Sequence, residues 1–194
     1  WGATRMARCA WAGTDASLVA YHDTEWGVPE HDSRALFEKL VLDGFQAGLS
    51  WLTILKKREN FRAAFAGFDP AVLAGGGEPE VARLLADPGI VRHRGQIEAT
   101  LGNARAWCAI EAHEGFASFL WDRVGGAPIR NAWEADADVP AQTALSRRIS
   151  RDLRAEGFRF AGPTIVYAFM QAVGMVNDHV VHCPRHAEIA RHAG

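Results

Sequence analysis

The chain has 194 residues, of which 48% are apolar and 23% are charged, and its formal net charge is −2. This length suffices for one domain with a hydrophobic core, or for a large domain with a smaller lobe, and the composition is ordinary for a globular protein. No apolar run reaches the roughly 18 to 20 residues of a membrane span, and the small net charge gives no overall basic signal for nucleic-acid binding.

The apolar residues predict helices along almost the whole chain. In residues 32–45, Asp32 or Ser33 can cap a helix whose apolar residues recur every three or four positions. Gly48 then interrupts the pattern, and Ser50 can cap the next helix. The predicted helices lie within residues 32–45, 50–65, 68–74, 78–87, 93–115, 116–124, 143–157 and 158–175.

The remaining segments fit an all-α class. Residues 125–142 combine glycine, proline and acidic residues, which predicts a surface loop or hinge. We find no convincing alternating strand, internal repeat or low-complexity tract. Short helices and sharp turns favour orthogonal multi-helix packing over a long-helix bundle.

The cysteines and the start of the chain indicate a compartment. The N-terminus lacks the charged and apolar regions of a signal peptide, so we expect a cytoplasmic protein. Cys9, Cys108 and Cys183 are odd in number and widely spaced. In a reducing compartment they favour metal binding or burial over a disulfide.

The segment NDHVVHCPRH, residues 177–186, suggests a metal site. On a helix, His179 and Cys183 would lie one turn apart on one face, a spacing that can hold one metal ion. A structural zinc ion takes four Cys or His ligands, which Cys9 and His22 could complete.

Other interpretations of this cluster stay open on spacing alone. A lone cysteine is most often a small buried apolar residue, and histidines near a terminus are usually solvated. His182 and His186 are rival ligands, and a catalytic zinc with three protein ligands and a water is a further possibility.

Basic and turn residues point toward nucleic acid. In RFAGPT, Gly162 permits close approach of a ligand, and Pro163 suits the first position of a helix whose free N–H groups can bind phosphate. Basic residues gather at KKR (56–58), RHR (92–94) and at Arg147, Arg148, Arg151, Arg154 and Arg159. Each group taken alone is more simply a solvated helix face.

Aromatic residues flank one acidic residue. Trp11, Tyr21, Trp26 and Trp51 lie on both sides of Asp43 in the sequence. Aromatic faces stack on bases and attract cations, so a pocket of this composition suits a flat, positively charged ligand that donates hydrogen bonds. The alternative is that at least half of them are core aromatics.

Seven segments together resemble the bacterial family of type I 3-methyladenine DNA glycosylases. They are RCAW, YHDTEWGVP, LDGFQAGLSWLTILKKRENFRAAF, GIVRHRGQI, GNARA, FRFAGPT and FMQAVGMVNDHVV. The resemblance extends from about Met6 to Cys183, and its motifs are long and specific. It implies an all-α, helix-hairpin-helix DNA glycosylase-like domain that hydrolyses the N-glycosidic bond of 3-methyladenine in alkylated DNA, in base-excision repair.

The resemblance also implies roles for individual residues, carried over by matching motif. The ligands of one structural zinc ion per chain, which would clamp the N- and C-terminal segments together, would be Cys9, His22, His179 and Cys183. The residues lining the base pocket would be Trp11, Tyr21, Asp43 and Trp51. Those contacting DNA would be Gly48 and Leu49, as a plug entering the duplex, and Arg159, Gly162 and Thr164 of the hairpin. His182 and His186 then become surface residues.

The same resemblance sets the expected organisation and partners. Residues 1–5 would be additional N-terminal residues, and residues 6–194 one glycosylase domain with a helical body at 33–175. The protein would be a monomer in the bacterial cytoplasm. Its partners would be double-stranded DNA with alkylated bases and free 3-methyladenine as product, without any membrane.

Two positions depart from the family pattern. Asp43 stands where the family commonly has glutamate, which shortens the reach by one methylene, about 1.5 Å. Leu18 stands where a tyrosine of the pocket is often found. We expect either a repacked pocket or a bridging water.

The residues suggest a mechanism. The damaged nucleotide must be flipped out of the duplex, and Leu49 can fill the vacated stack as an apolar wedge. Asp43 could accept a hydrogen bond from the exocyclic amine of the base. Because the positive charge moves from base to sugar as the bond breaks, another group must favour that state, and Asp178 is a candidate. No lysine for a lyase step is evident, so a monofunctional enzyme is expected.

Two other classes compete with a glycosylase. A zinc-stabilised nucleic-acid-binding domain without activity would not need clustered aromatic residues around a carboxylate. A zinc hydrolase would bind its metal through three protein ligands and keep one position open for water.

Overall fold

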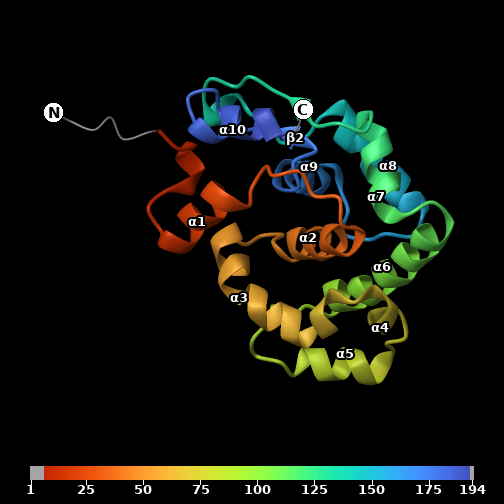
Figure 1. Cartoon of the computed structure of the whole chain (residues 1–194). Helices are drawn as coiled ribbons and strands as arrows, with labels where there is room; N and C mark the ends of the chain where they lie inside the picture. The colour runs from red at the N-terminus through yellow and green to blue at the C-terminus, as the bar shows by residue number, and fades with distance from the viewer. Residues whose placement is uncertain (1–6, 193–194) are drawn as a thin grey trace.

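The computed structural model describes residues 7–192, and in them the chain folds mainly into helices joined by loops and turns (Figure 1). The expected additional residues 1–5 lie outside the described residues. The α-helices are α1 (Ala16–Thr24), α2 (Ser33–Phe45), α3 (Trp51–Ala64), α4 (Pro70–Ala74), α5 (Glu78–Leu85), α6 (Arg94–His113), α7 (Phe116–Trp121), α8 (Ala144–Ala155), α9 (Pro163–Ala172) and α10 (Pro184–His192). The predicted helical class is confirmed. Within the described residues, no helix is both long and apolar enough to span a bilayer.

Local sequence signals set several helix starts. The Asp32 carboxylate accepts a hydrogen bond from the Ala35 N–H at 3.1 Å and caps α2. The Ser50 hydroxyl oxygen accepts one from the Thr53 N–H at 3.2 Å and caps α3. Prolines occupy the first turns of α4, α5 and α9, where no backbone donor is needed. The predicted caps of α2 and α3 are therefore confirmed.

Short elements complete the fold, and some of them differ from the prediction. They are the 3₁₀ helices η1 (Ala10–Ala12), η2 (Ala66–Phe68), η3 (Asp122–Val124) and η4 (Asp136–Asp138) and the parallel strands β1 (Ile129–Arg130) and β2 (Val176–Asn177). The sequence showed no alternating strand, and these two strands, of two residues each, are too short to show alternation. Since β1 pairs with β2, the predicted loop 125–142 is tied to the C-terminal segment.

Helix α2 lies at the centre of the molecule, between two apolar cores (Figure 1). Its Leu36 and Leu40 belong to the core formed with α7, α8 and α9. Its Phe37 and Val41 belong to the core formed with α3, α5 and α6. Because α2 is buried on both sides, it gives the polar residues on its remaining face a fixed position.

Helices α8 and α9 are joined by a tight turn that other parts of the chain hold in place. The Asn103 side chain bonds both the N–H (2.8 Å) and the carbonyl (3.0 Å) of Arg159. The Ser150 hydroxyl donates to the Ala161 carbonyl at 2.6 Å. Phe160 has a φ of 55°, in the left-handed region that side chains rarely adopt. These hydrogen bonds therefore fix the conformation of the turn, which is the segment predicted to contact DNA.

The segment between α1 and α2 packs against the end of α9. The Gly27 N–H donates to the Ala172 carbonyl at 3.1 Å, and the Glu30 N–H donates to the Val173 carbonyl at 2.9 Å. Gly174 has a φ of 74°, and a Cβ atom there would lie 2.5 Å from the backbone nitrogen of Pro29. This close approach requires glycine.

Gly174→Ala should therefore lower the free energy of unfolding by roughly 3 kcal/mol or more, since backbone atoms must move apart. The matched control is Gly102→Ala in the middle of α6, where a Cβ would meet no atom within 4 Å. That change should raise the stability by about 0.5 to 1 kcal/mol. Urea denaturation of both variants measures the difference, and equal midpoints would contradict the close approach.

Candidate functional site

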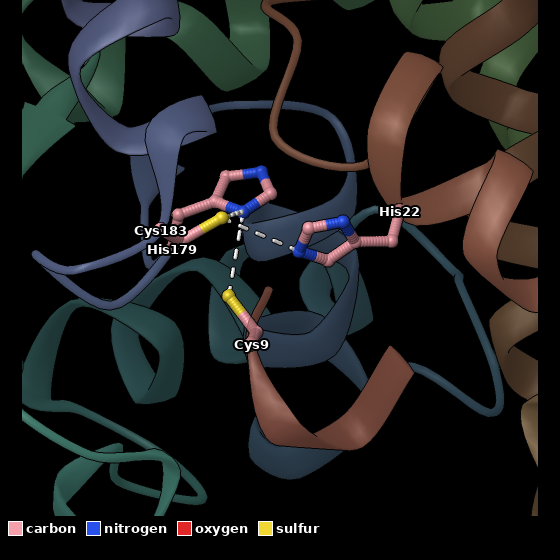
Figure 2. Close-up of side chains that lie close together, drawn as sticks. All are labelled: Cys9, His22, His179 and Cys183. Atoms are coloured by element: carbon pink, nitrogen blue, oxygen red, sulfur yellow. Dashed lines mark hydrogen bonds between the residues drawn. The ribbon is translucent and has the colours of Figure 1, made fainter. Parts of the chain in front are cut away.

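Two cysteines and two histidines from opposite ends of the chain form a buried cluster (Figure 2). The members are Cys9, His22, His179 and Cys183, and their potential ligand atoms all lie within 4.8 Å of one another. The Cys9 sulfur is 3.4 Å from His179 Nδ1, and the Cys183 sulfur is 3.6 Å from His22 Nε2 and 3.7 Å from His179 Nδ1. This arrangement could hold one metal ion.

Hydrogen bonds on the outer sides of the two histidines fix their orientation. His22 Nδ1 lies 2.7 Å from Asp23 Oδ1, and His179 Nε2 lies 2.9 Å from the Trp26 carbonyl oxygen. His22 Nε2 and His179 Nδ1 are thereby left facing the sulfur atoms. Histidines that bind metals commonly use their second nitrogen in this way.

The local structure of the cluster differs from the helix assumed for it. His179 and Cys183 lie in the turn before α10, which begins at Pro184. A spacing of four residues is compatible with a turn as well as with a helix, so the spacing alone could not distinguish them. His22 is the member that a helix, α1, presents to the cluster.

The two rival histidines lie outside this cluster. His182 is exposed and bonds Glu134 at 2.8 Å. His186, which was expected on the surface, is instead only 6% exposed. Its Nε2 lies 2.7 Å from the Asn131 carbonyl oxygen, so the loop between α7 and α8 covers it. Because that contact joins residues far apart in the sequence, the residues around His186 gave no indication that it is buried.

The polar contacts within the cluster favour a thiolate. A hydrogen bond with Cys9, and further ones with His179 and His22, lower the pKa of the Cys183 thiol well below its usual value, while the same bond raises the pKa of the Cys9 thiol. Metal ligation requires the deprotonated sulfur. The donor set is therefore chemically suited to a cation.

A second feature, a cavity of about 340 Å³, lies between α2, α3, α9 and the loop that carries η4. It is lined by Trp11, Tyr21, Trp26, Lys39, Asp43, Gln46, Trp51, Asp136, Val139, Ala168, Gln171, Ala172 and Asp178. The structure thus brings together the residues predicted for the base pocket. Leu18 is not part of this lining.

The aromatic residues of the cavity contact one another at angles. The ring centroids of Trp11 and Trp26 are 4.9 Å apart, and those of Tyr21 and Trp51 are 5.4 Å apart. Among residues 7–192, neither indole N–H of Trp11 and Trp51 has a hydrogen-bond partner, nor has Asp43 Oδ2. A ligand in the cavity could satisfy these buried polar atoms, whose desolvation is otherwise costly.

Lys39 is the cavity residue that the sequence analysis missed. Its Nζ donates to Asp43 Oδ1 at 2.7 Å and lies 3.5 Å from the ring centroid of Trp51. The side chains are only 15% and 3% exposed. Burial lowers the pKa of Lys39 and raises the pKa of Asp43, and each partner opposes the shift of the other. The sequence feature that could have identified Lys39 is its position four residues before Asp43, which places both side chains on one face of α2.

Asp178 is the best-satisfied carboxylate of the cavity. It accepts hydrogen bonds from Asn131 (2.7 Å), Trp133 (2.9 Å), Gln171 (3.0 Å) and the Tyr167 hydroxyl. All four donors are neutral, so the negative charge of Asp178 is held in place without a cation. Burial, followed by the bond to Asp178, raises the pKa of Tyr167 and keeps its hydroxyl protonated.

The residues predicted to contact DNA lie in two exposed turns. Gly48 and Leu49 belong to the turn between α2 and α3, between the cavity residues Gln46 and Trp51. Leu49 is 41% exposed, whereas most large apolar residues of the described chain are buried or partly buried. Gly48 has a φ of 76° and open space around it. An apolar tip therefore projects beside the cavity.

The second turn joins α8 and α9. Arg159 and Thr164 are exposed, and Gly162 caps α9 at its N-terminus. Within the described residues, Arg159 and Arg154 form no ion pair, whereas Lys56, Arg58 and Arg94 of the other predicted groups do. Arg58 binds Glu25 at 2.7 Å, and Arg94 binds Glu78 at 3.0 Å. Arg154 and Arg159, at or near this turn, are thus basic residues without an ion-pair partner among the described residues.

Known proteins resemble this chain over nearly its whole length. A family model described as methyladenine glycosylase matches residues 11–186. The DNA-3-methyladenine glycosylase 1 of Escherichia coli (strain K12) is 51% identical over 179 residues, covering 92% of this chain and 96% of the relative. A crystal structure of 3-methyladenine DNA glycosylase I has a TM-score of 0.90 at 51% identity, covering 92% of this chain and 98% of that one. The Staphylococcus aureus enzyme, solved to explain its recognition of 3-methyladenine, has a TM-score of 0.89 at 39% identity, covering 92% and 96% of the two chains.

Proposed function

The chain belongs to the methyladenine glycosylase family, and from this membership we propose that it excises 3-methyladenine from alkylated DNA by hydrolysing the N-glycosidic bond. The observation that carries the proposal is the cavity in which tryptophan and tyrosine rings surround a carboxylate oxygen without a partner among the described residues. The resulting abasic site is the starting point of base-excision repair. The predicted family and enzyme class are confirmed by the relatives.

The cavity suits a flipped-out base. Its volume of about 340 Å³ falls within the usual range for small-ligand sites. The rings of Trp11, Tyr21 and Trp51 can stack on a purine, and a base methylated at N3 carries a positive charge that aromatic faces attract. Asp43 Oδ2 would accept a hydrogen bond from the exocyclic amine. Extrusion of the nucleotide gives the base access to these groups.

Asp178 would stabilise the sugar as the bond breaks. The base leaves with the bonding electrons, and the positive charge moves to the sugar before water adds to C1′ and loses a proton. Asp178 lines the cavity with a charge that four neutral donors orient in advance. Preorganised charge of this kind can stabilise a transition state strongly.

DNA would contact the two exposed turns. Leu49 would enter the duplex as an apolar wedge in place of the extruded base, and Gly48 allows the turn that presents it. At the other turn, Arg159, Gly162 and Thr164 would bind the phosphate backbone through positive charge and the N-terminus of α9. This gives the α8–α9 pair the role of a helix-hairpin-helix motif.

The buried Cys/His cluster would hold one structural zinc ion. For Zn–S of about 2.3 Å and Zn–N of about 2.0 Å, a tetrahedron places sulfur and nitrogen about 3.5 Å apart. The three sulfur–nitrogen distances of 3.4, 3.6 and 3.7 Å agree with this value. Bound there, the ion would cross-link the terminal segments of a single domain, residues 6–194 with its helical body at 33–175, acting as a monomer in the bacterial cytoplasm.

The competing classes are less well supported. A domain that only binds nucleic acid would have no use for Asp43 and Asp178 in an aromatic cavity. A zinc hydrolase needs an open coordination position, whereas the cluster offers four buried ligands.

Purified protein should release 3-methyladenine from methylated duplex DNA, as measured by chromatography of the free base. Asp178→Asn should lower the single-turnover rate roughly hundredfold, because the oriented charge is lost. Tyr167→Phe is the matched control, since it removes one donor to Asp178 but keeps the charge. Absence of release by the wild type would contradict the function, and equal rates in both variants would contradict the role of Asp178.

Metal analysis of protein purified without chelator should find about one zinc ion per chain, as a four-ligand structural site requires. Cys183→Ser should bind zinc roughly a hundredfold more weakly or worse and unfold at a lower temperature. Cys108→Ser, a half-buried cysteine outside the cluster, should retain the metal. Wild-type protein free of zinc would end this proposal.

Leu49→Ala should slow release from duplex DNA by roughly tenfold or more, because the vacated stack is left unfilled. Its affinity for free 3-methyladenine should not change. Val72→Ala is the control, since Val72 is an exposed apolar residue of α4 away from the cavity lining. Duplex excision at the wild-type rate by Leu49→Ala would rule out the wedge.

A further inference from the structure

The base cavity contains a cation of its own before any substrate enters. The Lys39 ammonium lies 3.5 Å from the ring centroid of Trp51 and 5.9 Å from that of Tyr21, and it binds Asp43 at 2.7 Å. A cationic base would seek the same aromatic faces and the same carboxylate. Lys39 therefore occupies the interactions that would otherwise favour a positively charged ligand.

The surroundings hold Lys39 in this position. On the side away from the cavity, Glu25 is bound by Arg58 at 2.7 Å and Glu38 by Arg62 at 2.8 Å. Asp43 is thus the carboxylate that pairs with the Lys39 ammonium, and it lies four positions, about one helical turn, further along α2. Lys39 and Asp43 also come from a helix buried between two cores, which limits their movement.

The charges of the cavity are unevenly compensated. Besides Lys39, the charged lining residues are Asp43, Asp136 and Asp178. Lys39 cancels the charge of Asp43, whereas the hydrogen-bond donors to Asp178 are all neutral and bring no positive charge to it. A ligand near Asp43 thus meets a compensated pair, and a cation near Asp178 meets an uncompensated carboxylate.

We propose that Lys39 is a specificity-determining residue that acts as an internal counter-cation, reducing the preference of the base pocket for a cationic purine over a neutral one. The inference rests on the proposed glycosylase function. Its chemical consequence follows from differential binding: tight binding of the cationic base in the ground state would slow the step in which the charge leaves the base. Lys39 limits that ground-state attraction while its remaining N–H groups can donate to a ring nitrogen of the departing base.

The test compares two ligands that differ by one methyl group and one charge. 9-Methyladenine is neutral, and 3,9-dimethyladenine is a fixed cation with the same amine edge. Calorimetry gives the ratio of their affinities for each protein. Lys39→Met should raise the preference for the cation by roughly tenfold or more relative to wild type, because Asp43 and Trp51 become free to bind it. Lys56→Met, an exposed lysine of α3 outside the cavity, should keep the wild-type ratio.

Further variants separate charge from folding. Lys39→Gln keeps a hydrogen-bond donor for Asp43 without the charge, and it should change the ratio in the same direction even if Lys39→Met fails to fold. The double variant Lys39→Met with Asp43→Asn should return toward the wild-type ratio, because both charges are removed. At saturating enzyme, Lys39→Met should also release 3-methyladenine more slowly than wild type while binding methylated DNA more tightly.

An unchanged ratio in both Lys39 variants would overturn the inference, as would an equal loss of affinity for both ligands. A double variant with the ratio of Lys39→Met would overturn it too, since the freed Asp43 charge would not be the cause. A borohydride-trapped covalent adduct that joins DNA to Lys39 itself, located by peptide mapping, would contradict the charged state of Lys39. Release of 3-methyladenine by the wild type, measured on the same preparation, tests the glycosylase function separately.

Discussion

The joining of the two chain ends at the Cys/His cluster is the contact on which the geometry of the cavity depends. Three cavity residues are close in sequence to members of the cluster. Tyr21 directly precedes His22, Asp178 directly precedes His179, and Trp11 lies two positions after Cys9. The Trp26 carbonyl bonds His179 directly. Any displacement of the cluster would therefore move several walls of the cavity together, although no cluster residue lines it. A metal ion at this place would stabilise the aromatic cavity without taking part in its chemistry.

Helix α2 supplies the opposite wall and has little freedom to adjust. Leu36 and Leu40 pack into one core and Phe37 and Val41 into the other. Lys39 and Asp43 occupy the remaining face. The apolar packing of α2 therefore determines the position of their ion pair, rather than the attraction between the two charges. A buried ion pair is costly to desolvate and contributes little to stability by itself. Its presence in a ligand cavity is more readily explained by selectivity than by folding.

The sequence predicted most helices correctly because their signals are local. Caps such as Asp32 and Ser50 and the three- to four-residue spacing of apolar residues act within a single element. Contacts between distant segments left no such signal. The burial of His186 depends on a carbonyl of the loop near residue 131, and the short strands pair residues 129–130 with 176–177. The aromatic residues on both sides of Asp43 already indicated a pocket, and the resemblance to a family assigned most of its members, whereas Lys39, one turn before Asp43, was not predicted. The roles of the metal ligands and DNA contacts remain predictions.

The connection between the ends of the chain also bears on biosynthesis. Cys9 and His22 leave the ribosome long before their partners His179 and Cys183, which lie 170 and 161 residues later. The helical body around α2 to α6 can pack from contacts that are close in sequence, but Trp11, Tyr21 and Asp178 cannot meet until residue 178 has left the ribosome. Domains generally begin to fold during synthesis from their N-terminal side. Here the body can form early, while the aromatic cavity is completed later, so a chain that stops before residue 178 can be folded in large part and still lack a complete binding site.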